Sequence, residues 1–450
     1  MKQNKNNLDL SKNAVAIYGL GNVGGPIAAA WLRKRANIIG VDISLELLDS
    51  IKNGTSHRKE PFISKIFSNH LKNNSLSLSS DGIQASKNSN IKIISVPVDI
   101  KKNKIDLNAI ISVSKNISKG LKKGDAVIVC PSLPPGTTKN VVLPILEKQS
   151  NLKGEKDFFL IYNPERIFEG RALKDIEENY PAIVGGLGKK SLEFGTSLLK
   201  IISKKGVLQM TSLENAEAEK LFEGVYRDVN IALANELADY CKNIGVDYWE
   251  ARKGANSQPY CKLHYPGTGV GGLCIPIYPQ FILESAKKYR KPMKIITSSR
   301  KTNDQMPKKC VMDAIELLLK NKRNKKGAKI AVLGLGFRGE VTDSRLSPTY
   351  TVVNEFLKMD FSVSVHDPYI FEDKVLSKRV QLTSDIKNAV NKADLIFVST
   401  DHKIYSKLSS INFKGAKIPL LIFDGRNILN KNNFKNNIFS TIGIKNSNST

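Results

Sequence analysis

The feature that most constrains the fold is a glycine-rich turn that occurs twice, each time directly after a short apolar, β-prone run. The first turn reads Gly-Leu-Gly-Asn-Val-Gly from Gly19 and follows Val15–Tyr18. The second reads Gly-Leu-Gly-Phe-Arg-Gly from Gly334 and follows Ile330–Leu333. Such a turn joins a strand to a helix in dinucleotide-binding α/β domains. Two copies therefore predict two domains of related fold.

Later segments fit the same architecture. Further strands are predicted at 37–41, 91–96, 126–130, 158–161, 362–365, 395–398 and 420–423, and a helix at 26–33. Strands that alternate with helical patterns imply doubly wound parallel sheets. Residues 216–241 keep helical spacing without a proline, which predicts a long connecting helix that also offers a dimer face.

We therefore expect an α/β protein with two Rossmann-like doubly wound parallel-sheet domains joined by a central helical dimerisation domain. Its 450 residues suit about three domains at roughly 150 residues each. The expected divisions are a disordered tail (1–12), an N-terminal Rossmann domain (13–205), a central helical domain (206–320), a linker (321–327), a C-terminal Rossmann-like domain (328–440) and a second tail (441–450).

Composition narrows the class of protein. Lys and Arg number 69 against 42 Asp and Glu, a net charge of +27, which permits attraction of anions or nucleic acid. The basic residues are spread along the chain without an aromatic-interleaved stripe, so a dispersed basic surface is favoured over nucleic-acid binding. No stretch approaches the ~18 apolar residues of a membrane helix. We expect a soluble, cytoplasmic protein with no membrane or nucleic-acid partner.

Cysteine and histidine usage gives no sign of a metal site. The five cysteines are odd in number and form no CxxC pair, and the five histidines are scattered. Neither a disulfide framework nor a zinc site is indicated. One cysteine remains a candidate reactive thiol.

The first glycine turn is a candidate cofactor site. Gly19, Gly21 and Gly24 would let the backbone approach a pyrophosphate at a helix N-terminus, although a simple tight turn is the alternative. Asp42 ends the next strand, where a carboxylate can bind a ribose diol and repel a 2′-phosphate, which favours NAD over NADP. After the second turn Asp367 precedes a proline, and we expect a related fold with a different ligand.

Three further segments carry reactive side chains. Cys274 ends the run Tyr-Pro-Gly-Thr-Gly-Val-Gly-Gly-Leu-Cys, whose glycines can lie close against a ligand, so its thiol is a candidate nucleophile or a buried structural cysteine. Lys220 lies mid-helix on a largely small or apolar stretch and is otherwise a solvated lysine. Glu165 and Glu169 follow a strand and are either an exposed pair or groups that contact cofactor and activate water.

Together these residues resemble the UDP-glucose/GDP-mannose dehydrogenase family, over about residues 13 to 430 and in family order. The segment from Tyr226 to Glu236 and the Cys274 loop look most like the branch that oxidises UDP-N-acetyl-hexosamines. The resemblance implies two successive NAD-dependent oxidations at C6 of the sugar, through a thiohemiacetal and a thioester on Cys274. UDP-N-acetylmannosamine is the favoured substrate, for surface polysaccharide precursors, and UDP-N-acetylglucosamine, UDP-glucose and GDP-mannose remain alternatives.

The resemblance also implies residue roles. Lys220 would stabilise oxyanion charge and the thiolate, Glu165 would assist water attack, and Ser132 would lie near water and cofactor. Expected cofactor contacts are Gly19, Gly21, Asn22, Val23, Gly24, Asp42, Val96, Pro97, Ser132, Glu169 and Arg345. Expected substrate contacts are Arg166, Ile167, Lys220, Arg227, Tyr265, Gly267, Gly271, Arg338 and Arg426. Guanidinium groups suit diphosphates and carboxylates. A homodimer or higher oligomer is implied.

Several positions depart from the family pattern. Gly224 replaces the usual Asn four residues after the lysine, and Tyr278 replaces the usual Asp four residues after the cysteine. Other departures are Val96-Pro97-Val98-Asp99, Gln258-Pro259-Tyr260, Leu273 and Arg338. We expect a divergent, active subgroup. The alternatives are a two-electron dehydrogenase of the 6-phosphogluconate type, a non-catalytic nucleotide-sugar-binding or NAD-sensing relative, and a nucleic-acid-binding protein.

Overall fold

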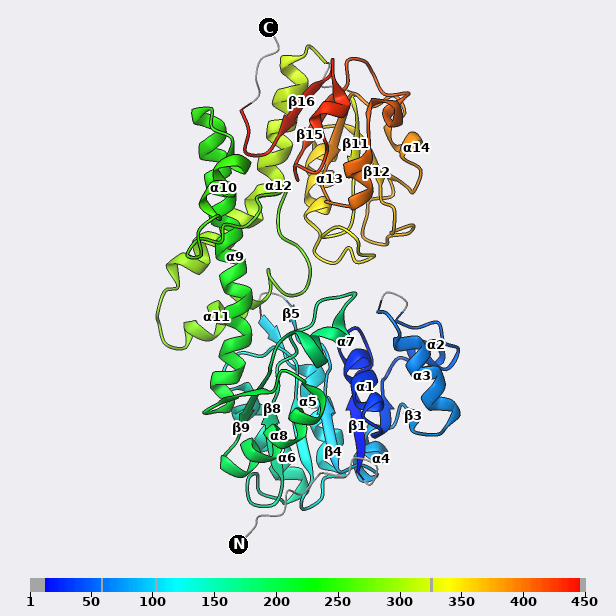
Figure 1. Ribbon diagram of the computed structural model, residues 1–450, viewed down its shortest axis with the longest axis vertical. Helices are drawn as coiled ribbons and strands as arrows, with labels where there is room; N and C mark the ends of the chain where they lie inside the picture. Colours follow the sequence, from blue (N-terminus) through cyan, green and yellow to red (C-terminus); the bar gives the residue numbers. More distant parts are fainter. Residues whose placement is uncertain (1–12, 58–59, 102–103, 324–326, 446–450) are drawn as a thin grey trace. The chain divides into compact units, whose positions relative to one another are not determined.

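The protein is described by a computed structural model that covers residues 13–57, 60–101, 104–323 and 327–445. The chain divides into two compact units, with the boundary between Glu223 and Gly224. Each unit contains one large, mostly parallel sheet (Figure 1). The predicted α/β class with two Rossmann-like sheet domains and a central helical region is confirmed.

The first unit is built on an eight-stranded sheet in the order β10-β9-β8-β7-β4-β1-β2-β3, in which only the β8–β9 pair is antiparallel. Its strands are β1 (Ala14–Tyr18), β2 (Asn37–Val41), β3 (Leu76–Ser79), β4 (Ile91–Ile94), β7 (Ala126–Val129), β8 (Phe159–Tyr162), β9 (Ala182–Gly186) and β10 (Val207–Met210). A two-stranded ribbon pairs β5 (Asp99–Lys101) with β6 (Lys104–Asp106). The strands predicted at 37–41, 91–96, 126–130 and 158–161 are confirmed within one or two residues.

Both faces of this sheet are covered, which explains its continuous apolar runs. In β1, Val15 and Ile17 belong to one core cluster, whereas Ala16 and Tyr18 belong to another on the opposite face. The covering elements are α1 (Gly24–Arg33), α2 (Leu45–Lys52), α3 (Ile63–Lys72), α4 (Gly82–Lys87), α5 (Asn108–Ser118), η2 (Thr138–Val142), α6 (Leu143–Ser150), α7 (Ala172–Lys174), η3 (Asp175–Asn179) and α8 (Lys189–Ile202). Because β1, β4, β7 and β8 run parallel, the segments after them meet at one edge of the sheet.

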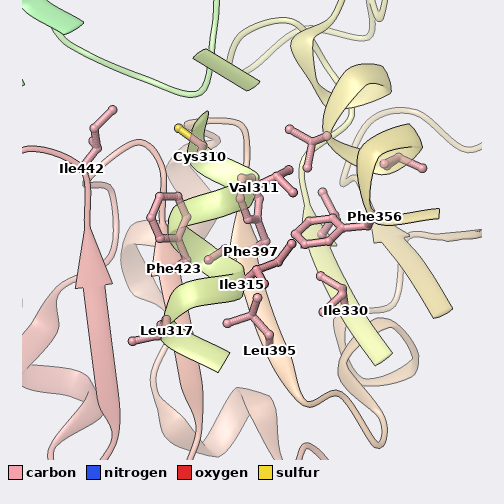
Figure 2. Packing of buried hydrophobic residues seen from close by; sticks show 14 of the residues in the cluster. Cys310, Val311, Ile315, Leu317, Ile330, Phe356, Leu395, Phe397, Phe423 and Ile442 are labelled. Atoms are coloured by element: carbon pink, nitrogen blue, oxygen red, sulfur yellow. The ribbon is translucent and has the colours of Figure 1, made fainter. Parts of the chain in front are cut away.

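The second unit begins inside α9 (Leu213–Ile244), which confirms the long helix predicted over residues 216–241. The helices α10 (Tyr248–Ala255), α11 (Tyr278–Lys287) and α12 (Lys294–Lys320) follow. The sequence did not predict α12, which contains Pro307. Its last turns pack into the core of the second sheet, where Val311 and Ile315 lie among Phe397 and Phe423 (Figure 2).

The second sheet is six-stranded and wholly parallel, in the order β13-β12-β11-β14-β15-β16. Its strands are β11 (Lys329–Leu333), β12 (Ser362–His366), β13 (Gln381–Thr383), β14 (Leu395–Val398), β15 (Leu421–Asp424) and β16 (Ile438–Thr441). The accompanying helices are α13 (Pro348–Lys358), α14 (Ile386–Val390), η4 (Lys403–Lys407), η5 (Ser410–Phe413) and η6 (Lys431–Phe434). The three strands predicted after the second glycine turn are confirmed.

The expected tail from residue 441 needs correction. Thr441 ends β16, the carbonyl of Ile442 accepts a hydrogen bond from the Trp249 indole at 2.9 Å, and the carbonyl of Gly443 accepts one from the Tyr248 N–H at 3.0 Å. Backbone hydrogen bonds and burial therefore hold these residues on α10. The expected tail at 1–12, part of the linker at 324–326 and residues 446–450 lie outside the described residues.

Candidate active site

The first glycine turn has the shape that an anion site requires. Gly19 has φ +91°, and a Cβ there would lie 2.8 Å from the Ser95 carbonyl oxygen. A Cβ on Gly24 would lie 1.8 Å from the Gly19 carbonyl oxygen. Close packing therefore leaves no room for a side chain at either position. A Cβ on Gly21 would meet no atom within 4 Å. The middle glycine thus faces open space beside the N-terminus of α1, which no side chain caps, and a pyrophosphate fits there.

Asp42 is fixed beside this turn. Its Oδ2 accepts a hydrogen bond from the Leu20 N–H at 2.8 Å, and its Oδ1 accepts one from the Ser44 N–H at 2.9 Å. The residue remains partly exposed, and the next side chain, Ile43, is 94% exposed. The carboxylate is therefore oriented by the backbone and still open to a ribose diol. The surroundings of the turn fit NAD.

Asp367, the counterpart of Asp42 after the second turn, has a different environment. It is fully buried, and its Oδ2 accepts hydrogen bonds from the Leu335 and Gly336 N–H groups at 2.7 and 3.0 Å. His402 Nε2 lies 3.2 Å from the same oxygen. Moreover, α13 begins only at Pro348, so no helix N-terminus follows this turn directly. The protein itself occupies the turn's donors, which supports the expectation of a different ligand.

The structure brings together two predicted catalytic residues. Lys220 Nζ lies 3.6 Å from Glu165 Oε1, and the two side chains are only 8% and 12% exposed. The other carboxylate oxygen of Glu165 accepts the Ile167 N–H at 3.1 Å. Lys220 is therefore not a solvated lysine. Ser132 follows β7 just as Glu165 follows the adjacent strand β8, so both lie beyond the same sheet edge.

Arg166, a predicted substrate contact, is held by glutamates of α9. Its Nη2 lies 2.7 Å from Glu223 Oε1 and its Nε lies 3.6 Å from Glu219 Oε1. Its guanidinium also stacks over Tyr180 at 4.9 Å. Burial, with Glu223 beside it, raises the pKa of Glu219 to about 7 despite the charge of Arg166. An anionic ligand at Arg166 would compete with these carboxylates.

The Cys274 loop is seated on the second glycine turn. A Cβ on Gly272 would lie 2.8 Å from the ring of Phe337, and one on Gly271 would lie 2.5 Å from the Leu346 carbonyl oxygen. The Gly272 N–H donates to the Arg345 carbonyl oxygen at 3.1 Å. Close packing therefore explains these loop glycines. Cys274 lies two residues after Gly272 and is exposed.

A buried polar network holds the start of this loop. Asn235 accepts the Gly267 N–H at 2.9 Å and donates to Asn303 at 3.0 Å. Asn303 in turn donates to Asp228, which also pairs with the buried Arg300. None of Asn235, Asp228, Arg300 and Asn303 was predicted. They act through backbone groups and one another, so their only sequence signal is a polar residue within an otherwise buried helical face.

Arginine side chains lie against the first residues of this loop. Arg426 lies against Gly267, where a Cβ would be 2.5 Å from its Nη1. The guanidinium of Arg252, which the sequence did not single out, stacks 3.7 Å over Tyr265. Burial and then the charges of Arg227 and Arg252 lower the pKa of His264. This cluster has the charge that suits a diphosphate.

The remaining predicted contacts are dispersed. Arg345 forms a forked ion pair with Asp343 (Nη2–Oδ2 2.6 Å), and Arg338 is partly buried beside Phe337. Val96 lies 3.3 Å from a Cβ built on Gly19, which places it at the first turn. Asn22, Val23, Pro97 and Glu169 lie in the segments after β1, β4 and β8.

Sequence reasoning also missed His57 at the first turn. Its Nε2 lies 2.8 Å from the Leu20 carbonyl oxygen, and a Cβ on Gly25 would lie 2.3 Å from that nitrogen. His57 thus packs directly over the turn. Its signal in the sequence was a lone histidine between two loop segments, which does not by itself indicate a role.

Comparison with known proteins gives the family. Models of the UDP-glucose/GDP-mannose dehydrogenase family match residues 13–203 (NAD binding domain), 214–305 (central domain) and 331–431 (UDP binding domain). The chain belongs to this family. It is an NAD-dependent UDP-sugar dehydrogenase, and the predicted cofactor, NAD, is confirmed by the first of these matches.

Named relatives of this dehydrogenase cover nearly its full length. It is 32% identical to the UDP-N-acetyl-D-mannosamine dehydrogenase of Pyrococcus horikoshii, over 92% of this chain and 96% of that one. It is 33% identical to the enzyme of that name from Campylobacter jejuni, over 88% and 97%. The solved P. horikoshii structure aligns with a TM-score of 0.87 at 31% identity, covering 96% and 99% of the two chains.

A second group of relatives bears another name. The dehydrogenase is 30% identical to the NDP-N-acetyl-D-galactosaminuronic acid dehydrogenase of Ralstonia nicotianae, over 90% of this chain and 94% of that one. The Methanosarcina mazei structure of that name aligns with a TM-score of 0.84 at 28% identity, over 96% of each chain.

No helix among the described residues combines the length and apolar character needed to cross a bilayer. Within the same residues, no three His, Cys, Asp or Glu side chains are grouped so that they would hold a metal ion.

Proposed function

We propose that this dehydrogenase oxidises C6 of UDP-N-acetylmannosamine from alcohol to carboxylate. The observation that carries the proposal is the buried pair of Lys220 and Glu165, 3.6 Å apart beyond the carboxyl end of β8. A lysine that stabilises oxyanion charge and a carboxylate that activates water are what a route through a covalent thioester requires. The names of the relatives at 32% and 33% identity support the choice of sugar.

The proposed chemistry uses the exposed thiol of Cys274. The first glycine turn and Asp42 would hold NAD, and two NAD molecules in succession would each accept one hydride. After the alcohol has become an aldehyde, the Cys274 thiolate adds to its carbon and gives a thiohemiacetal, whose oxyanion Lys220 stabilises. Removal of the second hydride leaves a thioester. Water, deprotonated with help from Glu165, displaces the thiolate and releases the carboxylate.

Substrate recognition follows from charge. Arg227, Arg338 and Arg426 are the proposed partners of the diphosphate and of the carboxylate product, with Arg166 as a further contact once it leaves Glu223. Tyr265, Gly267, Gly271 and Ile167 are proposed to line the sugar and nucleotide. Supply of uronic acid precursors to a surface polysaccharide and a cytoplasmic location, where NAD and nucleotide sugars meet, belong to the same proposal.

A second copy of the chain is the proposed partner of α9. The helix exposes Tyr226 (56%), Leu233 (44%) and Tyr240 (59%), which lie seven residues apart, and Ile244 (53%) continues the same stripe. A large apolar stripe at this spacing matches the seam of a paired helix. We propose a homodimer that buries this face.

A second candidate substrate is UDP-N-acetylgalactosamine. The relatives from R. nicotianae and M. mazei, at 30% and 28% identity, are both named NDP-N-acetyl-D-galactosaminuronic acid dehydrogenases. The fold and the catalytic residues serve either sugar, so a direct comparison of substrates separates the two.

The test is the yield of NADH per sugar consumed with excess NAD. UDP-N-acetylmannosamine, UDP-N-acetylgalactosamine, UDP-N-acetylglucosamine, UDP-glucose and GDP-mannose are compared. We expect two NADH for each UDP-N-acetylmannosamine and a carboxylate product, and Cys274→Ser is expected to abolish carboxylate formation. One NADH per sugar would contradict the thioester route. Tight binding of UDP-sugars without any NADH would favour a non-catalytic relative.

A further inference from the structure

Tyr278 and Gly224 occupy one shared volume. A Cβ on Gly224, inside α9, would lie 2.3 Å from Cδ2 of Tyr278 and 3.1 Å from its Cγ. Both residues are buried, and Tyr278 is only 6% exposed. Two carbon atoms that are not bonded do not approach to 2.3 Å, so any side chain at position 224 would displace the tyrosine ring.

The backbone of Tyr278 also holds the turn that carries Cys274. The Tyr278 N–H donates to the Cys274 carbonyl oxygen at 3.0 Å, and the Ile277 N–H donates to the same oxygen at 3.1 Å. These bonds close the turn that leads into α11. Tyr278 therefore binds the backbone of Cys274, while the ring of Tyr278 packs on α9.

Gly224 is unfavourable in the place where it occurs. It lies in the interior of a 32-residue helix, where glycine is less stable than alanine because its backbone loses more freedom on folding. A glycine there needs a packing reason, and the tyrosine ring supplies it. Since each residue accommodates the other, the two departures from the family pattern form one coupled exchange.

We propose that Tyr278 is a positioning residue, whose ring, seated on Gly224, fixes the turn that presents the Cys274 thiol. This deepens the proposed function and rests on it for the role of Cys274. The aromatic ring, held by shape, is the acting group. The phenol is not required to exchange a proton with substrate.

The test compares wild type with Gly224→Ala, Tyr278→Ala and the double variant. In the wild-type background, Gly224→Ala is expected to lower Tm by several degrees, because the added Cβ displaces the ring. In the Tyr278→Ala background the same change is expected to raise Tm, because the ring is absent and alanine favours the helix. Additive Tm shifts would overturn the coupling.

Catalytic measurements separate positioning from stability alone. Gly224→Ala and Tyr278→Ala are each expected to lower kcat at least tenfold, to leave the KM for the nucleotide sugar within about twofold, and to change the rate of Cys274 alkylation by iodoacetamide at least threefold. Tyr278→Phe keeps the ring and is expected to retain at least half of kcat. Tyr289→Ala, a change at a 75% exposed tyrosine just after α11, is the matched control and is expected to resemble wild type.

Two results would overturn the proposal. Unchanged kcat and alkylation in Gly224→Ala would show that the ring does not position the thiol, and a loss in Tyr278→Phe equal to that in Tyr278→Ala would show that the hydroxyl is the acting group. A different result would contradict the proposed function without contradicting the positioning role of Tyr278. Carboxylate formation by Cys274→Ser would refute the thioester route and leave the reversal of the Tm shift intact.

Discussion

At the scale of single residues, two aspartates occupy equivalent places after the two glycine turns and differ in what they bind. Asp42 accepts two backbone N–H groups and remains partly exposed. Burial alone would raise the pKa of Asp367, but hydrogen bonds from His402 and the Gly336 N–H hold it below its ordinary value. The first carboxylate is therefore available to a ligand, whereas the second is part of the fold.

This difference predicts the effect of Asp42→Asn. Loss of a charged acceptor for the ribose diol is expected to raise the KM for NAD by roughly 10- to 100-fold, since hydrogen bonds to charged groups are worth about 1.5–3 kcal/mol. The ratio of kcat/KM with NAD to kcat/KM with NADP is expected to fall in the same variant. Asp367→Asn, the matched control, is expected to lower Tm without changing the KM for NAD. Steady-state kinetics with both cofactors check this, and an unchanged KM in Asp42→Asn contradicts it.

Residue types with a local pattern were predictable, and contacts between distant residues were not. The spacing from Gly21 to Asp42 gave the cofactor site, because both belong to one strand–turn–helix–strand unit. The pairing of Arg166 with Glu223 and the fit of Tyr278 on Gly224 join residues more than fifty positions apart. Nothing local in the sequence encodes such distances.

At the scale of elements, the sequence reveals best the strands that are both buried and apolar along their length. All four residues of β4 and of β7 are buried. β7 is a continuous apolar run, and β4 is interrupted only by Lys92, whose buried side chain pairs with Asp125. Of the strands that the sequence did not predict in this sheet, β3 and β10 form its two edges and read Leu-Ser-Leu-Ser and Val-Leu-Gln-Met, with exposed positions. The third, β9, is interior and almost wholly buried, but two of its five residues are glycines, so its apolar run is short. Edge strands bury less apolar surface, and their pattern resembles that of loops.

Glu217 of α9, which contacts the backbone at the start of η2, predicts that the stability of the fold depends on pH. Glu217 accepts the Gly136 and Thr138 N–H groups, at 2.5 and 2.8 Å. Burial outweighs these hydrogen bonds and raises its pKa from 4.5 to about 7. The folded state then keeps a proton that the unfolded state has lost, so this group's contribution to the free energy of unfolding falls as pH rises from about 4.5 to about 7, by on the order of 3 kcal/mol.

Glu217→Gln removes this titration and isolates its effect. As pH rises from 5 to 8, the Tm of wild type relative to that of the variant is expected to fall, because only wild type loses the proton. Thermal melts of both proteins in the same buffers cancel the contribution of other groups. If instead the Tm of wild type rises relative to that of the variant as pH increases, the N–H donors, rather than burial, set the pKa of this carboxyl.

At the scale of the whole molecule, the +27 charge and the α9 stripe are surface features that the catalytic residues do not explain. The charge is dispersed and suits attraction of anionic nucleotide sugars, an effect that salt screens. The stripe is apolar and confined to one helix, so it indicates association with another protein surface. The periodicity of residues 216–241 predicted this helix, but which of its apolar residues are exposed depends on how α12 and the loops pack around it.

The dimer proposal predicts the result of placing a charge in the middle of the stripe. In Leu233→Glu a carboxylate would have to be buried between the two copies of α9, and burial of an unpaired charge costs several kcal/mol. The variant is expected to elute at the 49.8 kDa mass of one chain, whereas wild type elutes at twice that mass, as light scattering after size exclusion measures. Leu319→Glu is the matched control, because Leu319 is 51% exposed near the end of α12, outside the stripe, and it is expected to leave the dimer intact. A monomeric wild type, or a dimer that survives Leu233→Glu, would remove α9 as the interface.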